Sequence, residues 1–531
     1  MKHPSQESHR PLVIGQQGVI ASGHPLASSI GASILQDGGN AIDAMVAAAA
    51  AMAVLRPHMS GLGGEALTLI YLGRERRLVG LEGIGTAPQK SLAFFRSQGI
   101  SRIPARGILS STVPAAVKAW ATALERYGTR PLAALLAPAI ALAEQGFPVS
   151  KKLAIDIAQH AALLMESPHA RALFLRKGSP IGAGEMLIQK DLGHSLKVLA
   201  EGGAEVLYHG EISAAIAQFC SRHNGLLSRE DFAGYEVRWV EPIRGSYRGC
   251  EICAFPPPSQ GIALPLALHV LEAFDPGKLS WADWLHRQVE AKKVVFADRD
   301  RFVGDPGRTA LPVRQLLSRE YAASRRALID LKRASARFRP GEPWAIAGET
   351  TYLAVADRMG NVVSHMQSIF SPFGSGVVAG KTGILLNNRL SGFALDGGVN
   401  QLEPGRRPFH TLTPVILFRA GQPFLALGTP GAHGQVQSLL QILSYLLDYG
   451  FDLQAAIEAP RWRHDTGQGL FMEGRFPEPV RRMLSRRGHR IRLQPAWARQ
   501  MGGAQGILLD PQTGFSLGAA DPRREGYALG W

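Results

Sequence analysis

Blocks of apolar and polar residues alternate along the chain, and the spacing within each block predicts one kind of element. Apolar residues at helical spacing predict helices in residues 31–35, 41–55, 113–157, 262–274, 281–303 and 438–447. Alternating apolar residues predict strands in residues 65–71, 77–81, 237–254, 350–356, 362–369, 383–386, 414–419 and 423–428. Because no Gly/Ser linker or repeat divides these blocks, we expect stacked layers around one continuous α+β core.

The pattern breaks in the Pro/Gly-containing stretch of residues 335–348, which predicts an exposed connection. Thr350 and Thr351 follow this stretch, at the start of a predicted β-hairpin. A threonine that becomes a chain N-terminus can use its own α-amino group as the base for its hydroxyl. A Thr-Thr pair is also ordinary in strands, which favour β-branched residues. The local pattern therefore leaves both interpretations open.

The apolar fraction of 46% is typical of a globular protein, whereas the net charge of +15 raises the question of nucleic-acid binding. Positive residues concentrate in residues 324–340 and 481–493, where apolar residues interrupt them at the spacing of a packed element. No recognition-helix, RNP-type or zinc-finger pattern accompanies them. We therefore expect no nucleic-acid partner, and a charge that attracts anionic substrates instead.

Other short motifs carry no chemistry in their context. Cys250 and Cys253 form C-x-x-C within a predicted strand, but no second pair or nearby histidine completes a zinc site, so no metal is expected. Residues 514–518 fit G-x-S-x-G, yet no histidine follows, as a nucleophile elbow requires. The first twenty residues lack a secretory apolar run, and the apolar residues 44–55 are too few to span a bilayer. A cytoplasmic enzyme without a membrane partner is expected.

From Thr350 onward the sequence resembles the small subunit of the γ-glutamyltransferase family, whose members are self-cleaving N-terminal-nucleophile (Ntn) hydrolases. The shared motifs are Thr350-Thr351, Asp-x-x-Gly-Asn at 357–361, Phe-Gly-x-Gly at 373–376 and Gly-Ile-Leu-Leu-Asn-Asn at 383–388. Further similar stretches follow the family's order at residues 18–71, 228–249, 256–261, 427–435 and 518–530. The resemblance covers almost the whole chain and implies an α+β fold, a four-layer αββα sandwich.

The resemblance also implies that the chain cuts itself between Glu349 and Thr350. The products would be a large subunit, residues 1–349, and a small subunit, residues 350–531, which stay together as one catalytic heterodimer that could itself form a dimer. Thr350 would then be the nucleophile, and its freed amine would be the base. The sequence implies no metal and no organic cofactor.

Four further residues match the family's catalytic positions, and His433 lies beside two of them. Ser368 stands where a hydroxyl hydrogen-bonds the nucleophile, and Thr351 is expected to steady the new N-terminus, although either hydroxyl could instead serve only backbone groups. In the sequence TPGAHG, the backbone N–H groups of Gly431 and Ala432 would stabilise an oxyanion. Ala432 replaces a glycine there, which requires a φ that is not positive. His433 could shape the pocket or be structural.

The residues that would hold a γ-glutamyl group are replaced. Ile84 stands at the family's Arg position, Phe370 at the Asn position, Arg389 at the Gln position and Gly392 at the Asp position. His410 and Thr411 replace the family's pair of serines. Each replacement removes a charge or a hydrogen bond, and a buried ammonium without its carboxylate loses about 3–5 kcal/mol. Arg389 could bind a substrate carboxylate with its planar fork, or form a structural salt bridge. Phe370 would supply an apolar wall.

The expected activity is that of a self-cleaving amidohydrolase or acyltransferase, which forms an acyl-enzyme on Thr350 and passes a non-glutamyl acyl group to water or an amine. Oxamate amidohydrolases and cephalosporin-type acylases are relatives of this kind. One alternative is a true γ-glutamyltransferase or glutathione hydrolase, and another is an unprocessed, non-catalytic homologue. For either kind of enzyme, but not for the non-catalytic homologue, the expected partner is a small-molecule amide.

Overall fold

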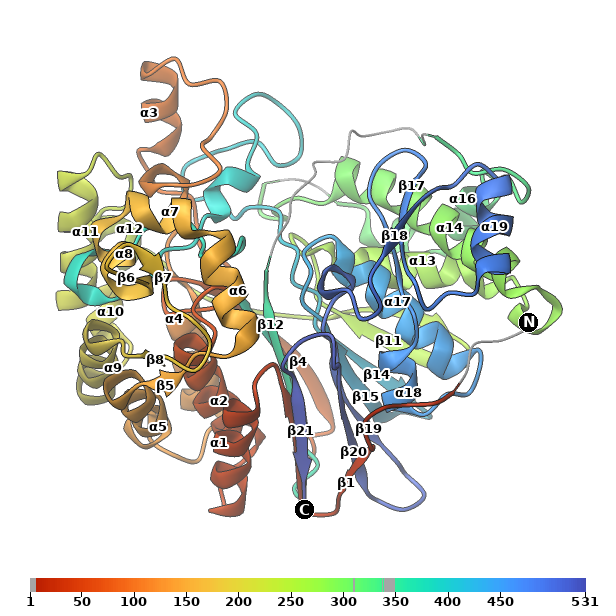
Figure 1. Ribbon diagram of the computed structural model, residues 1–531, viewed down its shortest axis with the longest axis horizontal. Helices are drawn as coiled ribbons and strands as arrows, with labels where there is room; N and C mark the ends of the chain where they lie inside the picture. Colours follow the sequence, from red (N-terminus) through yellow and green to blue (C-terminus); the bar gives the residue numbers. More distant parts are fainter. Residues whose placement is uncertain (1–5, 309–310, 337, 339–348) are drawn as a thin grey trace.

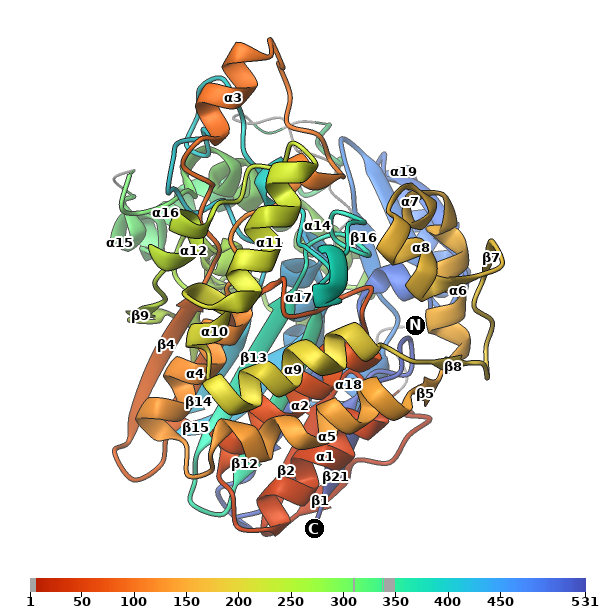
Figure 2. The ribbon, with the colours of Figure 1, turned by 90° about the vertical axis from the view of Figure 1, so that its left-hand side faces the viewer.

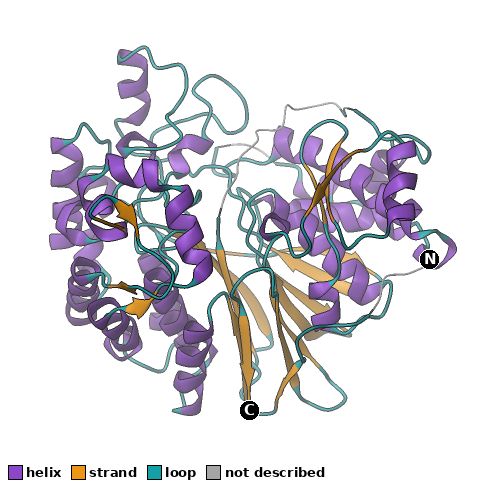
Figure 3. Ribbon diagram, viewed as in Figure 1, coloured by secondary structure: helices purple, strands orange, loops and turns teal. Residues whose placement is uncertain are grey.

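Two seven-stranded sheets lie face to face at the centre of the molecule, and helices cover the outer face of each sheet (Figures 1 and 3). The computed structural model describes residues 6–308, 311–336, 338 and 349–531. The four layers are the expected αββα sandwich. Of the expected connection over residues 335–348, only Ser335, Ala336, and Phe338 are among the described residues.

The first sheet carries the predicted hairpin at its centre. Its strands run in the order β21 (Tyr527–Gly530), β2 (Gly18–Ser22), β12 (Thr351–Asp357), β13 (Val362–Ser368), β3 (Glu65–Leu72), β4 (Arg77–Gly83) and β9 (Arg238–Val240). All neighbouring strands in it are antiparallel. Strands from before and after residue 350 therefore pair directly with one another in this sheet.

The second sheet mixes the two parts of the chain in the same way. Its order is β1 (Val13–Gly15), β20 (Ser516–Ala520), β19 (Gln505–Leu509), β15 (Gln422–Gly428), β14 (Val415–Arg419), β11 (Cys250–Ala254) and β10 (Ile243–Tyr247). Apolar side chains such as Leu67, Tyr352 and Ile416 fill the space between the sheets. Cys253 lies in this inner core, but Cys250 packs in the outer one, so the two thiols lie on opposite faces of β11.

A helical layer covers the outer face of the first sheet (Figure 2). It contains α1 (Pro25–Gln36), α2 (Ala41–Leu55), α4 (Ala116–Tyr127), α5 (Leu132–Gln145) and α9 (Lys190–Gly202). Helix α2 is buried along its whole length, because its many alanines let it pack closely against α1, α5 and the sheet. Asn40 and Asp43 form a capping box at its N-terminus. The bounds predicted for this helix are confirmed.

The second helical layer packs on the second sheet. It contains α13 (Ala263–Glu272), α14 (Trp281–Phe302), α17 (Gly434–Leu447) and α18 (Leu453–Glu458). The remaining helices are α3 (Ser91–Ser97), α6 (Lys151–Gln159), α7 (Ala161–Glu166), α8 (Pro168–Phe174), α10 (Glu205–Tyr208), α11 (Glu211–Arg222), α12 (Arg229–Ala233), α15 (Val313–Leu316), α16 (Arg319–Arg326) and α19 (Glu478–Arg486). The remaining strands are β5 (Phe147–Pro148), β6 (Leu175–Arg176), β7 (Ser179–Pro180), β8 (Met186–Leu187), β16 (Trp462–His464), β17 (Gly469–Glu473) and β18 (Arg490–Gln494).

One predicted strand is wrong. Residues 383–386 form no strand, and Leu385 and Leu386 make only isolated bridges. Gly383 has a φ of +66°, a left-handed conformation that ends extended geometry. The short buried apolar run imitates a strand in sequence. Within the described part of the chain, no helix combines the length and the hydropathy needed to cross a bilayer.

Candidate active site

The β12–β13 hairpin brings Thr350 and Ser368 to the same end of the first sheet. In its register Thr351 pairs with Gln367, so the residue before β12 lies beside the last residue of β13. At the other end of the hairpin, the Asp357 carboxylate accepts hydrogen bonds from backbone N–H groups of the turn. Such a side-chain-stabilised turn fixes the register, and the register fixes the distance between the two hydroxyls.

The Thr350 hydroxyl is buried and lies within a short chain of hydrogen bonds. Its Oγ1 donates to Ser368 Oγ and accepts from Nε2 of Gln435, both at 3.4 Å. Ser368 Oγ donates in turn to the carbonyl oxygen of Glu349 at 2.7 Å. The hydroxyl of Thr350 therefore lies next to the peptide bond before it, and Ser368 polarises the carbonyl of that bond.

The side chain of Glu349 forms ion pairs with arginines. Its carboxylate is paired with Arg524 and lies 3.6 Å from the guanidinium of Arg499. Burial alone would raise the pKa of this carboxyl, but the two guanidinium groups outweigh burial and hold its pKa below the usual value. Glu349 is therefore anionic at neutral pH, and its ion pairs fix the residue that provides the carbonyl.

The loop of residues 429–433 joins β15 to α17 beside Thr350, and Pro430 lines a small cavity with that threonine. Within the described part of the chain, no hydrogen bond uses the backbone N–H groups of Gly431 and Ala432. They precede the N-terminus of α17, which favours negative charge. Ala432 has a φ of +50°, so the expectation of a non-positive φ is wrong. This conformation costs about 1 kcal/mol for a residue with a Cβ.

Gln260 holds this loop through its side-chain amide. Its Nε2 donates to the carbonyl oxygens of Thr411 and Ala432, at 2.7 and 3.0 Å. Arg299 donates to its Oε1 at 2.9 Å, and the same guanidinium lies 3.0 Å from Nδ1 of His433. Because two carbonyls accept and one guanidinium donates, the orientation of the amide is determined. The strained loop is therefore fixed by residues that precede Thr350 in the chain.

Arg389 lies close to this site and is only partly paired. Its Nε donates to Glu65 Oε2 at 2.8 Å, and its guanidinium lies over the ring of Phe370, 4.0 Å from the centroid. Its two terminal nitrogens are buried and have no hydrogen-bond partner among the described residues. Phe370 in turn contacts Ser368 Oγ through its backbone N–H, at 2.8 Å. The predicted structural salt bridge is therefore present and uses Nε, whereas substrate binding by the terminal nitrogens stays a prediction.

Glu65 balances the charge of Arg389. Burial would raise the pKa of Glu65, but Arg389 and His410 outweigh it and hold the pKa below its usual range. Burial, assisted by the charge of Arg389, lowers the pKa of His410 to about 4, so its ring is neutral at pH 7. His410 therefore donates from Nε2 to Glu65 Oε2 at 2.8 Å and accepts the N–H of Leu412 at Nδ1. The ion pair of Glu65 and Arg389 carries no net charge.

Among the described contacts, the other predicted site residues take no part in the hydrogen bonds of the Thr350 hydroxyl. The Thr351 hydroxyl donates to the carbonyl of Gln367 at 3.3 Å. Ile84 is buried between the sheets, and the carbonyl of half-buried Gly392 accepts a hydrogen bond from Asn400. The side chain of His433 contacts Arg299 and Phe409, and its carbonyl accepts from Gln437. The carbonyl of Thr411 accepts from Gln260 and Thr413.

The structure adds residues that the sequence analysis did not single out: Glu65, Gln260, Gln435, Arg499 and Arg524. Four of them had a signal in the sequence. Glu65 is an acidic residue at the start of a mainly apolar strand, and Gln260, Gln435 and Arg524 lie in stretches that resemble the family. Arg499 lies outside these stretches, in an ordinary polar context.

Comparison with known proteins assigns the family. The model of the family described as Gamma-glutamyltranspeptidase matches residues 27–531. The chain is 38% identical to the "Glutathione hydrolase-like YwrD proenzyme" of Bacillus subtilis (strain 168), covering 98% of this chain and 99% of that protein. It is 38% identical to the "Acylase ACY 1 proenzyme" of Pseudomonas sp. (strain SE83), covering 96% and 93%.

A solved structure agrees with both the fold and this assignment. The crystal structure of cephalosporin acylase from Bacillus halodurans superposes with a TM-score of 0.93 at 37% identity, covering 99% of this chain and 98% of that one. The match extends over both sheets and both helical layers. The chain belongs to the γ-glutamyltranspeptidase family of Ntn hydrolases.

Proposed function

We propose that the chain cuts itself between Glu349 and Thr350 and then hydrolyses amides whose acyl group is not γ-glutamyl. The observation that carries the first part is the position of Ser368. Its hydroxyl contacts both the Thr350 hydroxyl and the carbonyl oxygen of Glu349. Nucleophile, carbonyl and hydrogen-bond donor are therefore already assembled in the uncut chain.

Self-cleavage needs only these groups and water. Thr350 Oγ forms a bond to the carbonyl carbon of Glu349, while Ser368 stabilises the negative charge that develops on the carbonyl oxygen. The C–N bond then breaks, the nitrogen takes the proton from the hydroxyl, and an ester joins the two residues. Water hydrolyses this ester, which leaves a carboxylate on Glu349 and both a free amine and a hydroxyl on Thr350.

The freed amine then serves as the base for amide hydrolysis. An α-amino group has an ordinary pKa of about 7.7–8.0, so it can accept the Thr350 proton near neutral pH. The hydroxyl oxygen attacks the substrate carbonyl, and the N–H groups of Gly431 and Ala432 stabilise the oxyanion. The amine product leaves with the proton, and water releases the acid from the acyl-enzyme.

Arg389 supports a substrate whose acyl group ends in a carboxylate. Its buried terminal nitrogens have no hydrogen-bond partner among the described residues, and they form the planar fork that binds a carboxylate bidentately. A γ-glutamyl group has such a carboxylate too, but it would also bring an α-ammonium towards a buried guanidinium. Phe370 provides an apolar surface beneath the same guanidinium. The acyl group that fits these residues is therefore a short dicarboxylic one.

The two fragments would remain together after cleavage. Residues 1–349 and 350–531 contribute neighbouring strands to both sheets, as in the pairing of β2 with β12 and of β13 with β3. Separation would break these ladders and expose the core between the sheets. This interleaving supports a heterodimer in which neither fragment folds alone.

Replacement of Arg524 by Gln should slow self-cleavage. Without the ion pair, the Glu349 carbonyl moves relative to the Thr350 hydroxyl. Small displacements of that kind lower a reaction rate roughly tenfold or more. A time course of the uncut chain on denaturing gels measures the rate. Arg482→Gln is the matched control, because Arg482 pairs with Glu478 on the exposed side of α19. Equal rates for the two variants would refute the role of Arg524.

The same ion pair gives a pH dependence. The folded-state pKa of Glu349 is lowered, so its contribution to stability is present above its ordinary pKa of 4.5 and is lost as the pH falls through the lowered value. Glu349 should therefore keep its ion pair with Arg524 between pH 5 and 8. In this range, protonation of Glu349 should not lower the rate of self-cleavage of the wild type, as followed on denaturing gels.

Replacement of Gln260 by Ala should lower kcat by roughly 100-fold and leave KM nearly unchanged, because the variant releases the loop that bears the oxyanion donors. Steady-state kinetics on the purified, cleaved enzyme measure both constants. Gln454→Ala is the matched control, since Gln454 is equally buried and bonds Glu458 and Ala520 away from Thr350. A rise in KM with kcat retained would contradict this positioning role.

A substrate screen tests the proposal as a whole. Oxamate, a glutaryl amide and a γ-glutamyl amide are compared with the cleaved enzyme at equal concentration. We expect turnover of oxamate or the glutaryl amide, and a kcat/KM for the γ-glutamyl amide that is roughly 150- to 5,000-fold lower, because an unpaired buried ammonium costs about 3–5 kcal/mol. Efficient γ-glutamyl turnover would refute the specificity and leave the Thr350 chemistry intact.

A further inference from the structure

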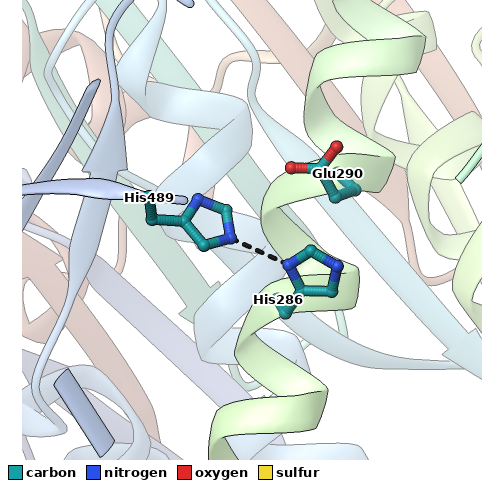
Figure 4. A group of neighbouring side chains, drawn as sticks. All are labelled: His286, Glu290 and His489. Atoms are coloured by element: carbon teal, nitrogen blue, oxygen red, sulfur yellow. Dashed lines mark hydrogen bonds between the residues drawn. The ribbon is translucent and has the colours of Figure 1, made fainter. Parts of the chain in front are cut away.

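A second group of chemically reactive side chains lies at the join between α14 and the segment before β18. His286 and Glu290 are four residues apart on α14, so they point to the same side of the helix. His489 faces them from the residue that precedes β18 (Figure 4). All three side chains are buried, and their nearest ligand atoms lie within 4.8 Å of one another.

The hydrogen bonds of His286 leave its Nδ1 as an electron-pair donor. Its Nε2 lies 2.8 Å from the carbonyl oxygen of Asp330, which can only accept, so Nε2 carries the hydrogen. This is the arrangement in which a backbone carbonyl orients a metal-binding imidazole. Nδ1 points at Nε2 of His489, 2.8 Å away.

His489 can offer a second nitrogen without a change in charge. In the hydrogen bond to His286, its Nε2 donates, and its Nδ1 is buried with no hydrogen-bond partner among the described residues. If the hydrogen moves from Nε2 to Nδ1, both facing nitrogens present lone pairs and the ring stays neutral. Burial lowers the pKa of both rings, and the charge of Lys293 lowers that of His489 further.

Glu290 completes the set with a carboxylate. Its Oε1 accepts from Lys293 at 2.7 Å and its Oε2 from the backbone N–H of Ser335 at 3.1 Å. Each oxygen keeps a further lone pair. Two imidazoles and one carboxylate form a ligand set that Zn²⁺ takes in proteins. Two nitrogens bound to one tetrahedral zinc ion lie roughly 3.3 Å apart, so the rings need to separate by about half an ångström.

We propose that His286, Glu290 and His489 bind a divalent transition-metal cation of the Zn²⁺ type. The ion takes the position of the hydrogen now shared by the two imidazoles, and water completes its coordination. The site does not depend on self-cleavage, since all three residues are present in the uncut chain. One consequence does rest on the proposed function. After cleavage, His286 and Glu290 belong to one fragment and His489 to the other, so the ion links the two fragments.

Metal content of the purified protein tests the site directly. The chain is expressed with added zinc, passed over a chelating resin to remove surface metal, and measured by inductively coupled plasma mass spectrometry. We expect one zinc per chain in the wild type and in Thr350→Ala, and none in His489→Gln. The exposed His209 provides the matched control, and His209→Gln should retain the full content. Less than a tenth of an equivalent in the wild type, or equal content in His489→Gln, would overturn the proposal.

A milder variant covers the case in which His489→Gln fails to fold. Glu290→Gln keeps the size of the side chain and an acceptor for Ser335, and it should weaken zinc binding roughly 10- to 100-fold in competition with a chromophoric chelator. Unchanged affinity would overturn the proposal. For the link between fragments, a chelator should lower the urea midpoint of fragment separation in the wild type but not in Glu290→Gln. Metal content in uncut Thr350→Ala separates failure of the metal site from failure of self-cleavage.

Discussion

Thr350→Ala should leave the chain whole and without amidase activity. Alanine removes the oxygen that attacks the Glu349 carbonyl, so neither the ester nor the new N-terminus can form. Loss of a nucleophile lowers turnover on the order of 10⁴-fold or more, and here loss of the freed amine removes the base as well. Denaturing gels give the extent of cleavage, and release of the amine product gives the activity.

Thr350→Ser is the matched control for this experiment. Serine keeps the hydroxyl and, after cleavage, the amine, so the chain should still cut itself, and the product should retain measurable turnover. The hydrogen bonds to Ser368 and Gln435 can form with either residue. A Thr350→Ala chain that cuts at residue 349, or that hydrolyses amides like the wild type, would place the nucleophile elsewhere.

Replacement of Arg389 should abolish the preference for acyl groups that end in a carboxylate. Loss of one partner of a buried charge pair costs about 2–5 kcal/mol, which corresponds to a fall in kcat/KM of roughly 30- to 5,000-fold. The readout is the ratio of kcat/KM for a glutaryl anilide to that for a butyryl anilide, which lacks the carboxylate. A ratio reports on recognition, because any general loss of active enzyme cancels.

A variant of Arg389 must not leave the buried carboxylate of Glu65 without its ion-pair partner. Arg389→Met alone strands that carboxylate and can destabilise the fold. The double variant Arg389→Met/Glu65→Gln removes both charges, and its amide can still receive the hydrogen bond from His410. We expect the substrate ratio to fall towards one in the double variant. An unchanged ratio would show that the carboxylate of the substrate binds elsewhere.

The sequence predicted the frame of the site because the relevant signals are local. The β12–β13 hairpin was visible from its alternation and its turn residues, and Asp357 binds the turn as such a motif requires. The run of residues 41–55 predicted a helix with the bounds that α2 has. The family match adds the four layers. Strand prediction failed at residues 383–386, where burial alone produces a strand-like apolar run.

The contacts that tune the site are long-range, and no local pattern indicates them. Glu65 and Arg389 are 324 residues apart, Gln260 and Ala432 are 172 apart, and the Arg524 that pairs with Glu349 is 175 residues further along the chain. Only the fold brings these side chains together. The fold also determines that, among the described residues, none pairs with the two terminal nitrogens of Arg389.

The central claim is that Thr350 becomes an N-terminus by the chain's own chemistry. Intact mass analysis with N-terminal sequencing of the purified wild-type protein tests it most directly. We expect two species, residues 1–349 and residues 350–531, the second beginning with Thr350, and their appearance from the uncut chain at a rate independent of protein concentration. A single species of 57.2 kDa that stays intact and turns over no amide would contradict the account.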